Sequence, residues 1–312
     1  MNTSSSNSPL RALVLAGAGA AGNAWQIGLV AGLADAGVDL TCAELVIGTS
    51  AGSTAAAMLT SGTRPAELYA ATQAEIKAEQ APHRPQSGPP NGPQPGATPS
   101  RAAMSATAYM DWSGQMIAAS VDADDWRRRM SAAILERDPP DDATSRRWHD
   151  TVAARLPNQE WPQQRVLITA VDARSAQPVV FDRGSGIHLA DAVAASTSNG
   201  TAGAYHLGEH RYINGAYRRS SNADLATGYD RVLVLDPFGG RSRTPLDWGM
   251  DLATQVDELR AAGSTVETVF PDAAAGEVFN ANAADPSTRP QAARGGYEQG
   301  RGLAESLAGF WG

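Results

Sequence analysis

The stretch Gly48-Thr49-Ser50-Ala51-Gly52 contains the residue types whose spacing most directly suggests chemistry. A serine with a glycine two positions away on each side fits a sharp turn, because glycine tolerates backbone geometry that side chains obstruct. An apolar run, Leu45–Ile47, precedes this turn, and a helix-forming segment, Ser53–Leu59, follows it. Such a turn exposes a hydroxyl at a helix N-terminus, where backbone N–H groups favour developing negative charge. The pattern therefore predicts a nucleophile elbow, with Ser50 as the candidate nucleophile.

A glycine loop earlier in the chain is the second motif. It follows the expected strand Leu13–Leu15, and its spacing also matches the dinucleotide fingerprint G-x-G-x-x-G. Nucleotide binding additionally calls for an acidic residue at the end of the second strand, which here ends at Ser50. Adjacent parallel strands would bring both turns to one edge of the sheet, so an oxyanion hole is the favoured interpretation. A tight turn without chemistry is the first alternative, and nucleotide binding is the second. The loop residues are Gly17, Ala18, Gly19, Ala20, Ala21 and Gly22.

No histidine is well placed to act as the base for Ser50. An α/β-hydrolase would carry its histidine near the C-terminus, whereas the last histidine here is His210. His83 falls in a proline-rich segment, and His149 and His188 fall in expected helices. His206 and His210 lie near a strand that leads to Asn214, so a catalytic role for either one stays open.

Alternating strand and helix signals run along the chain and predict a three-layer α/β/α fold with a mostly parallel sheet. We expect residues 11–312 to form one domain after a disordered N-terminus at 1–10. Residues 81–100 contain seven of the nineteen prolines, which predicts a flexible insert. Residues 101–150 have helical patterns and could form a cap near the site. The other expected strands are 166–170, 178–181, 211–213, 231–235 and 266–270, and the other expected helices are 23–36, 65–79, 188–195, 246–262 and one at the C-terminus.

Composition narrows the classes of partner. The formal net charge of −8 argues against nucleic acid and against purely electrostatic attachment to an anionic membrane. The single cysteine, Cys42, excludes an intrachain disulfide and is expected to be a buried small hydrophobe. The single cysteine fits a reducing compartment, and we recognise no signal peptide or membrane span, so we expect a cytoplasmic location. We expect neither a metal site nor a cofactor.

The order of these motifs resembles the patatin-like phospholipase family. The matching features are the early strand and glycine loop, the Gly48–Gly52 turn, Asn214-Gly215-Ala216, and Asn222-Ala223-Asp224 after it. The resemblance implies a serine–aspartate dyad without histidine that cleaves acyl esters of lipids, with transient membrane contact. Ser50 would be the nucleophile, and backbone amides around Gly19 would form the oxyanion hole.

This chain departs from the family pattern at four positions. Ala18 replaces a glycine, Ala21 replaces a basic residue, and Asp224 replaces a proline. The fourth departure matters most for chemistry, because Asn214 stands where the family has the dyad aspartate. An amide has no basic lone pair at neutral pH and cannot accept the serine proton.

Four interpretations of Asn214 follow. It could be an inactivating change in an otherwise intact hydrolase, or another carboxylate, Asp224 or Asp236, could serve as the base. The Asn214-Gly215 pair could deamidate and regenerate an aspartate. The protein could bind acyl lipids without cleaving them. For the reaction as a whole, transfer of the acyl group to an acceptor other than water is an alternative to hydrolysis. The oligomeric state stays open.

Overall fold

The structure is a computed structural model that describes residues 9–79, 104–139, 141–275, 278–280 and 282–312. The predicted insert at 81–100 and most of the predicted disordered N-terminus lie outside the described residues. Of that N-terminal segment, Pro9 and Leu10 are described, and the N–H of Leu10 donates to the carboxylate of Asp230 at 2.7 Å. Leu10 is therefore attached to the folded part of the chain.

A single mixed sheet forms the centre of the fold. Its strand order is β5-β6-β3-β2-β1-β7-β8, and β4 pairs with β3 at the side. Strands β1, β2, β3, β7 and β8 pair in parallel, whereas β4, β5 and β6 are antiparallel. The strand bounds are β1 Arg11–Leu15, β2 Leu45–Gly48, β3 Arg165–Asp172, β4 Gln177–Phe181, β5 Tyr205–Leu207, β6 His210–Asn214, β7 Arg231–Leu235 and β8 Thr265–Val269. The predicted neighbours β1 and β2 are confirmed as a parallel pair, which brings the glycine loop beside Ser50.

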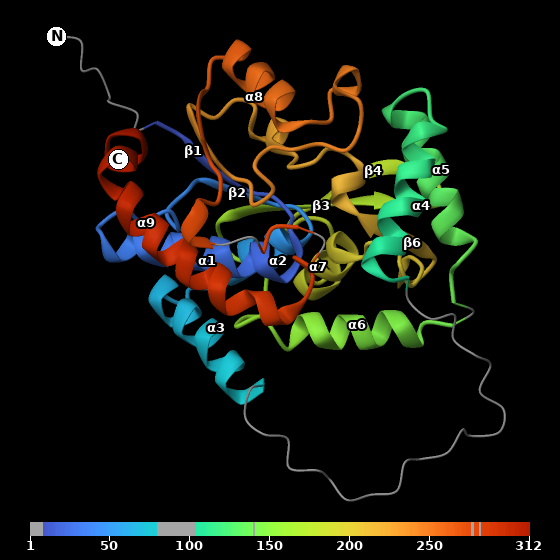
Figure 1. Ribbon diagram of the computed structural model, residues 1–312, viewed down its shortest axis with the longest axis horizontal. Coiled ribbons are helices and arrows are strands. Elements are labelled where there is room, and N and C mark those ends of the chain that lie inside the picture. The colour runs from blue at the N-terminus through green and yellow to red at the C-terminus, as the bar shows by residue number, and fades with distance from the viewer. Residues whose placement is uncertain (1–8, 80–103, 140, 276–277, 281) are drawn as a thin grey trace, which may run out of the picture.

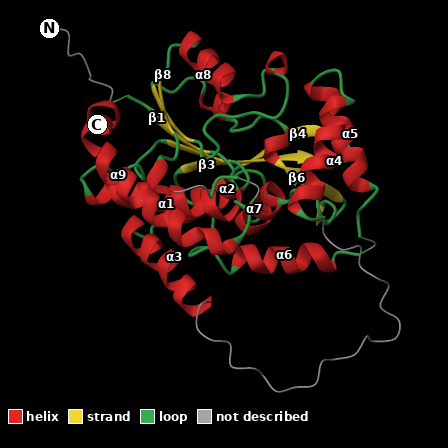
Figure 2. Cartoon of the chain, viewed as in Figure 1, coloured by secondary structure: helices red, strands yellow, loops and turns green. Residues whose placement is uncertain are grey.

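Helices cover both faces of this sheet (Figure 1). Helices α1, α2, α7 and α9 lie on one face, and α8 lies on the other, as the secondary-structure colours make clear (Figure 2). The helix bounds are α1 Gly19–Asp35, α2 Ala51–Leu59, α3 Pro65–Glu79, α4 Ala106–Ala118, α5 Ala123–Leu135, α6 Ala143–Ala153, α7 Leu189–Thr197, α8 Leu252–Ala261 and α9 Arg289–Trp311. Helices α4, α5 and α6 occupy the region for which a helical cap is predicted, and the capping role stays a prediction.

Strand alternation explains why two cores form. Leu13 and Leu15 of β1 point into the core beneath α1, whereas Ala12 and Val14 point into the core beneath α8. Successive side chains of a strand face opposite sides of the sheet, so an entirely apolar strand needs cover on both faces. The three-layer α/β/α arrangement predicted from the sequence is confirmed.

Helices α1 and α9 pack unusually closely because glycines lie at their contact. A Cβ atom at Gly28 of α1 would lie 2.1 Å from the carbonyl oxygen of Ala293, and one at Gly300 of α9 would lie 2.2 Å from that of Leu29. Any side chain at these positions would push the helices apart. Helix α9 therefore packs in close backbone contact with α1, the helix that starts at the glycine loop.

Several local predictions need correction. Helix α1 begins at Gly19, not near Asn23, so the last four residues of the predicted loop form the first turn of this helix. The helix expected at 246–262 is interrupted at Gly249, which has a φ of 64°, and α8 starts afresh behind the N-cap Asp251. Strand β5 was missed, because only three residues form it. Cys42 is exposed, so the prediction that it is buried was wrong.

Candidate active site

Ser50 lies at the turn between β2 and α2. Its φ of 54° and ψ of −127° belong to a strained conformation for a residue with a side chain. The flanking glycines are sterically required, since a Cβ at Gly48 would lie 2.5 Å from Cα of Ser53. A Cβ at Gly52 would lie 2.0 Å from the carbonyl oxygen of Leu15. The glycine spacing read from the sequence thus has a direct packing cause.

The backbone of Ser50 is held from two sides. Its N–H donates to Oγ of Ser196 at 2.9 Å, and its carbonyl accepts hydrogen bonds from N and Oγ of Ser53 at 2.8 Å and 2.5 Å. Ser196 lies in α7 and is fully buried. Sequence reasoning missed Ser196, because nothing in its local pattern distinguishes it from an ordinary helix residue.

Asn214 meets Ser50 at the end of strand β6. Nδ2 of Asn214 donates to Oγ of Ser50 at 2.9 Å, and Oδ1 of Asn214 accepts the N–H of Ala216 at 2.9 Å. The backbone N–H of Asn214 donates to the carbonyl of Ser198 at 2.7 Å. The side chain is nearly buried, at 8 % exposed. The structure thus brings the predicted nucleophile and the predicted dyad position into contact.

The orientation of the Asn214 amide follows from its neighbours. The N–H of Ala216 can only donate, so the oxygen of the amide must face it and the nitrogen must face Ser50. The Ser50 oxygen is therefore the acceptor in this pair. An aspartate in the same position would keep the bond to Ala216 and would turn a carboxylate oxygen toward the serine proton.

The glycine loop lies directly against Ser50. A Cβ at Gly17 would lie 2.6 Å from Cβ and 3.2 Å from Oγ of Ser50. The N–H groups of Ala21 and Gly22 are engaged, with the carbonyls of Ala283 and Ala18 respectively, both at 2.9 Å. The first N–H groups of a helix have no acceptor within it. The oxyanion hole stays a prediction. Among the backbone N–H groups predicted for it, those of Gly19 and Ala20 at the start of α1 are better candidates than those of Ala21 and Gly22, which already have acceptors.

The two alternative carboxylates have other partners. Asp224 forms a two-pronged ion pair with Arg218, with N–O distances of 2.9 Å and 2.6 Å. Asp236 accepts the N–H of Phe238 at 2.9 Å and is buried, not at the surface as expected. Burial raises the pKa of the Asp236 carboxyl to about 6. Within the described residues, the hydrogen bonds of both groups lead away from Ser50.

His206 and His210, for which a catalytic role was open, contact carboxylates and not Ser50. His206 lies between two carboxylates, with Nδ1 at 2.8 Å from Asp142 and Nε2 at 3.1 Å from Asp138. His210 is exposed, and its Nδ1 lies 3.4 Å from Asp172. Neither contact involves Ser50. The arrangement around Ser50 thus lacks the serine–histidine pair of a triad in the part of the chain that the structure describes.

Groups of metal-ligating side chains are not found among the described residues. The helices in those same ranges are all too short or too polar to cross a bilayer.

The chain is similar to a family of known proteins. The model of the family described as patatin-like phospholipase matches residues 13–227, which include the glycine loop, Ser50, Asn214 and Asn222. The crystal structure of VipD from Legionella pneumophila is similar with a TM-score of 0.44 and 11% identity, covering 96% of this chain and 67% of that chain. No curated protein matches the chain. Because the family model spans more than half of its residues, the chain belongs to the patatin-like phospholipase family.

Proposed function

We propose that this protein is a lipid acyl hydrolase in which Ser50 is the nucleophile and position 214 is the second member of the dyad. The observation that carries the proposal is the 2.9 Å contact between Oγ of Ser50 and the side chain of Asn214. The strained backbone of Ser50 supports it, since strain of this kind concentrates at functional sites. Family membership supports lipid esters as the substrate class.

The proposed reaction needs a proton acceptor at position 214. Oγ of Ser50 attacks the ester carbonyl, its proton leaves to a base, and the carbonyl oxygen becomes an oxyanion that the amides at the start of α1 stabilise. The alkoxide leaves with a proton, and water then releases the acid from the acyl-enzyme. Asn214 cannot accept the first proton, because its nitrogen is a donor. We therefore expect slow hydrolysis by this chain.

Loss of one member of a serine constellation lowers the rate by about 10⁴-fold, while the oxyanion hole leaves some activity. We expect a deficit of this order here. Replacing Asn214 by aspartate should repair it without rearrangement, because the two side chains have the same shape. Deamidation would reach the same product, but it is disfavoured while both ends of the Asn214 amide are hydrogen-bonded.

A second candidate function is binding of acyl lipids without cleavage. The specific observation in its favour is the direction of the Asn214 hydrogen bond, which stabilises Ser50 as an acceptor and not as a nucleophile. Acyl transfer is a variant of the first proposal in which an acceptor other than water attacks the acyl-enzyme.

The test compares hydrolysis of p-nitrophenyl butyrate and octanoate by the chain as it stands, by Asn214→Asp and by Ser50→Ala. Intact mass shows whether any Asn214 has deamidated. We expect Asn214→Asp to hydrolyse both esters about 10⁴-fold faster than the chain as it stands. We expect Ser50→Ala to show only the rate of spontaneous hydrolysis. If the chain as it stands is already fast and Asn214→Asp adds nothing, another residue is the base. If neither chain hydrolyses esters but both bind octanoate, the binding function replaces the hydrolase.

A further inference from the structure

Asn222 is a buried residue whose side chain joins the two halves of the candidate site. Its Nδ2 lies 3.0 Å from Oγ1 of Thr49 and 3.1 Å from the carbonyl oxygen of Gly215. Thr49 directly precedes Ser50, and Gly215 directly follows Asn214. We propose that Asn222 is a positioning residue that fixes the separation between Ser50 and residue 214.

The central strand β3 is part of the same arrangement. Nδ2 of Asn222 also lies 3.2 Å from Oγ1 of Thr169, which in turn lies 3.1 Å from Oγ1 of Thr49. A Cβ at Gly215 would lie 2.1 Å from that Thr169 oxygen, so the loop after Asn214 is pressed against β3. One amide thus ties three segments that meet at the carboxyl end of the sheet.

The backbone of Asn222 is strained in a way that suits this role. Its φ of 57° and ψ of 31° are left-handed, and it is fully buried. Asparagine tolerates this region better than most residues, but glycine tolerates it best. The need for a left-handed turn alone would therefore be met by glycine, whereas the hydrogen bonds to Thr49 and Gly215 require the amide.

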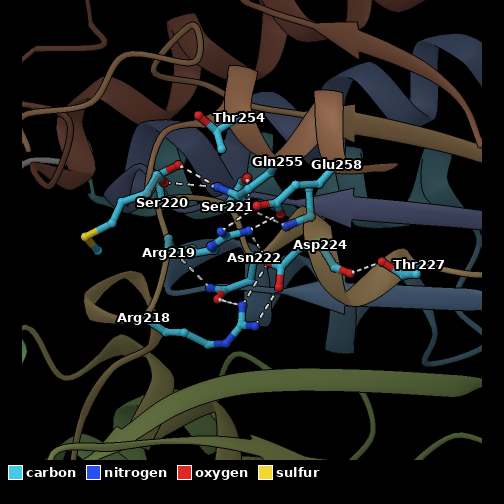
Figure 3. A network of polar contacts seen from close by, with 12 residues as sticks. Arg218, Arg219, Ser220, Ser221, Asn222, Asp224, Thr227, Thr254, Gln255 and Glu258 are labelled. Atoms are coloured by element: carbon cyan, nitrogen blue, oxygen red, sulfur yellow. Dashed lines mark hydrogen bonds and ion pairs between the residues drawn. The ribbon is translucent and has the colours of Figure 1, made fainter. Parts of the chain in front are cut away.

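A charged network holds the Asn222 amide in one orientation (Figure 3). Nη1 of Arg218 donates to Oδ1 of Asn222 at 2.8 Å, and Arg218 also pairs with Asp224. A guanidinium can only donate, so the amide oxygen must face Arg218 and the nitrogen must face Thr49.

Helix α8 anchors the segment that carries Asn222. Oε1 of Gln255 accepts the N–H of Ala223 at 2.8 Å, and its Nε2 donates to the carbonyl of Met250 at 3.0 Å. Gln255 is fully buried and lies beside Ser221 in the network (Figure 3). Helix α8 lies on the face of the sheet opposite to α1, so hydrogen bonds from that face hold the segment that carries Asn222.

The proposal rests on the proposed hydrolase function, so the test uses Asn214→Asp as the parent chain. Asn222→Gly relieves the backbone strain and removes the amide. Asn222→Asp keeps the shape but turns an oxygen toward the carbonyl of Gly215. We expect both to lower kcat by about 10²-fold, the cost of a misplacement of about 1 Å, with KM within about threefold of the parent. Thr227→Ala, which removes an exposed hydroxyl from the same short segment, should leave kcat unchanged.

Two further measurements separate positioning from general damage. Thr49→Val removes an acceptor of the Asn222 amide, so its effect on kcat should not add to that of Asn222→Gly, whereas Thr49→Ser should restore the parent rate. Crystal structures of the parent and Asn222→Gly should show a longer distance between Oγ of Ser50 and the side chain of residue 214.

An unchanged distance overturns the proposal, and so does a kcat within about threefold of the parent once the folded fraction is taken into account. An inactive Asn214→Asp parent is a failure of the proposed function instead. In that case the distance in the two crystal structures still decides the role of Asn222.

Discussion

Nδ2 of Asn214 donates a hydrogen bond of 2.9 Å to Oγ of Ser50, although 164 positions separate the two residues in the chain. The bond runs in the direction opposite to the one that a dyad needs. Under the proposed function, this site would be assembled in shape but would have no proton acceptor at position 214. The predictions below follow from this relationship and from the packing that supports it.

Asn214→Ala should hydrolyse p-nitrophenyl butyrate at a rate within about threefold of the chain as it stands, because the amide contributes no base. Asn214→Asp should exceed both by about 10⁴-fold. Initial rates at saturating substrate test this. A marked loss of activity in Asn214→Ala would mean that the amide itself takes part in the reaction.

Ser196→Ala should weaken the turn at Ser50, because it leaves the N–H of Ser50 without its acceptor. An unpaired donor costs about 1–3 kcal/mol when it is fully buried, and because this contact is partly buried we expect a loss near the lower end, about 1 kcal/mol. Urea unfolding measures this loss, and Ser306→Ala, which removes an exposed hydroxyl from α9, is the control. Equal free energies of unfolding for the two variants would contradict the prediction.

Gly17→Ala should disable Ser50 in the Asn214→Asp chain. The added Cβ would lie 2.6 Å from Cβ of Ser50, so the nucleophile must move. We expect a loss of about 10²-fold in labelling of Ser50 by a fluorophosphonate, followed by intact mass. Gly309→Ala, whose Cβ would meet no atom within 4 Å, should label at the parent rate.

Gly300→Ala should destabilise the protein, because its Cβ would lie 2.2 Å from the carbonyl oxygen of Leu29. Overpacking of this kind costs about 1–3 kcal/mol. Gly302→Ala in the same helix meets open space and should stabilise by up to about 1 kcal/mol, since alanine is the better helix former. Denaturant unfolding of both variants tests the opposite signs.

Asp236 should make the free energy of unfolding fall as the pH rises from about 4 to above 6. Burial raises its pKa to about 6 from an ordinary value of 3.8, so over this range the folded protein binds more protons at Asp236 than the unfolded chain. The decline attributable to this group amounts to up to about 3 kcal/mol. Asp236→Asn, which keeps an acceptor for the N–H of Phe238, should remove it.

The control for this pH dependence is Asp285→Asn. Hydrogen bonds from Ser287 lower the pKa of the exposed Asp285 carboxyl, so its contribution has the opposite sign. This variant should leave the decline above pH 4 in place. If Asp236→Asn declines as steeply as the unchanged chain, another group carries the pH dependence.

The sequence by itself determined the features that depend on local spacing. The glycines around Ser50 predict a strand–turn–helix because each is needed within a few residues of the serine, and Gly48 and Gly52 indeed leave no room for a Cβ. The alternation of strands and helices determined the three-layer fold, because each apolar strand must be covered on both faces.

Only the tertiary structure decided what surrounds Ser50. Ser50 bonds to Ser196 and to Asn214, which lie 146 and 164 positions further along the chain. Thr49 and Asn222, which are also in contact, lie 173 positions apart. Hydrogen bonds across such separations depend on how strands pair and on which amide atom faces which neighbour, and local patterns carry neither. The physical reason is that the chemistry of position 214 depends on the direction of one hydrogen bond, which exists only once β2, β3 and β6 have assembled.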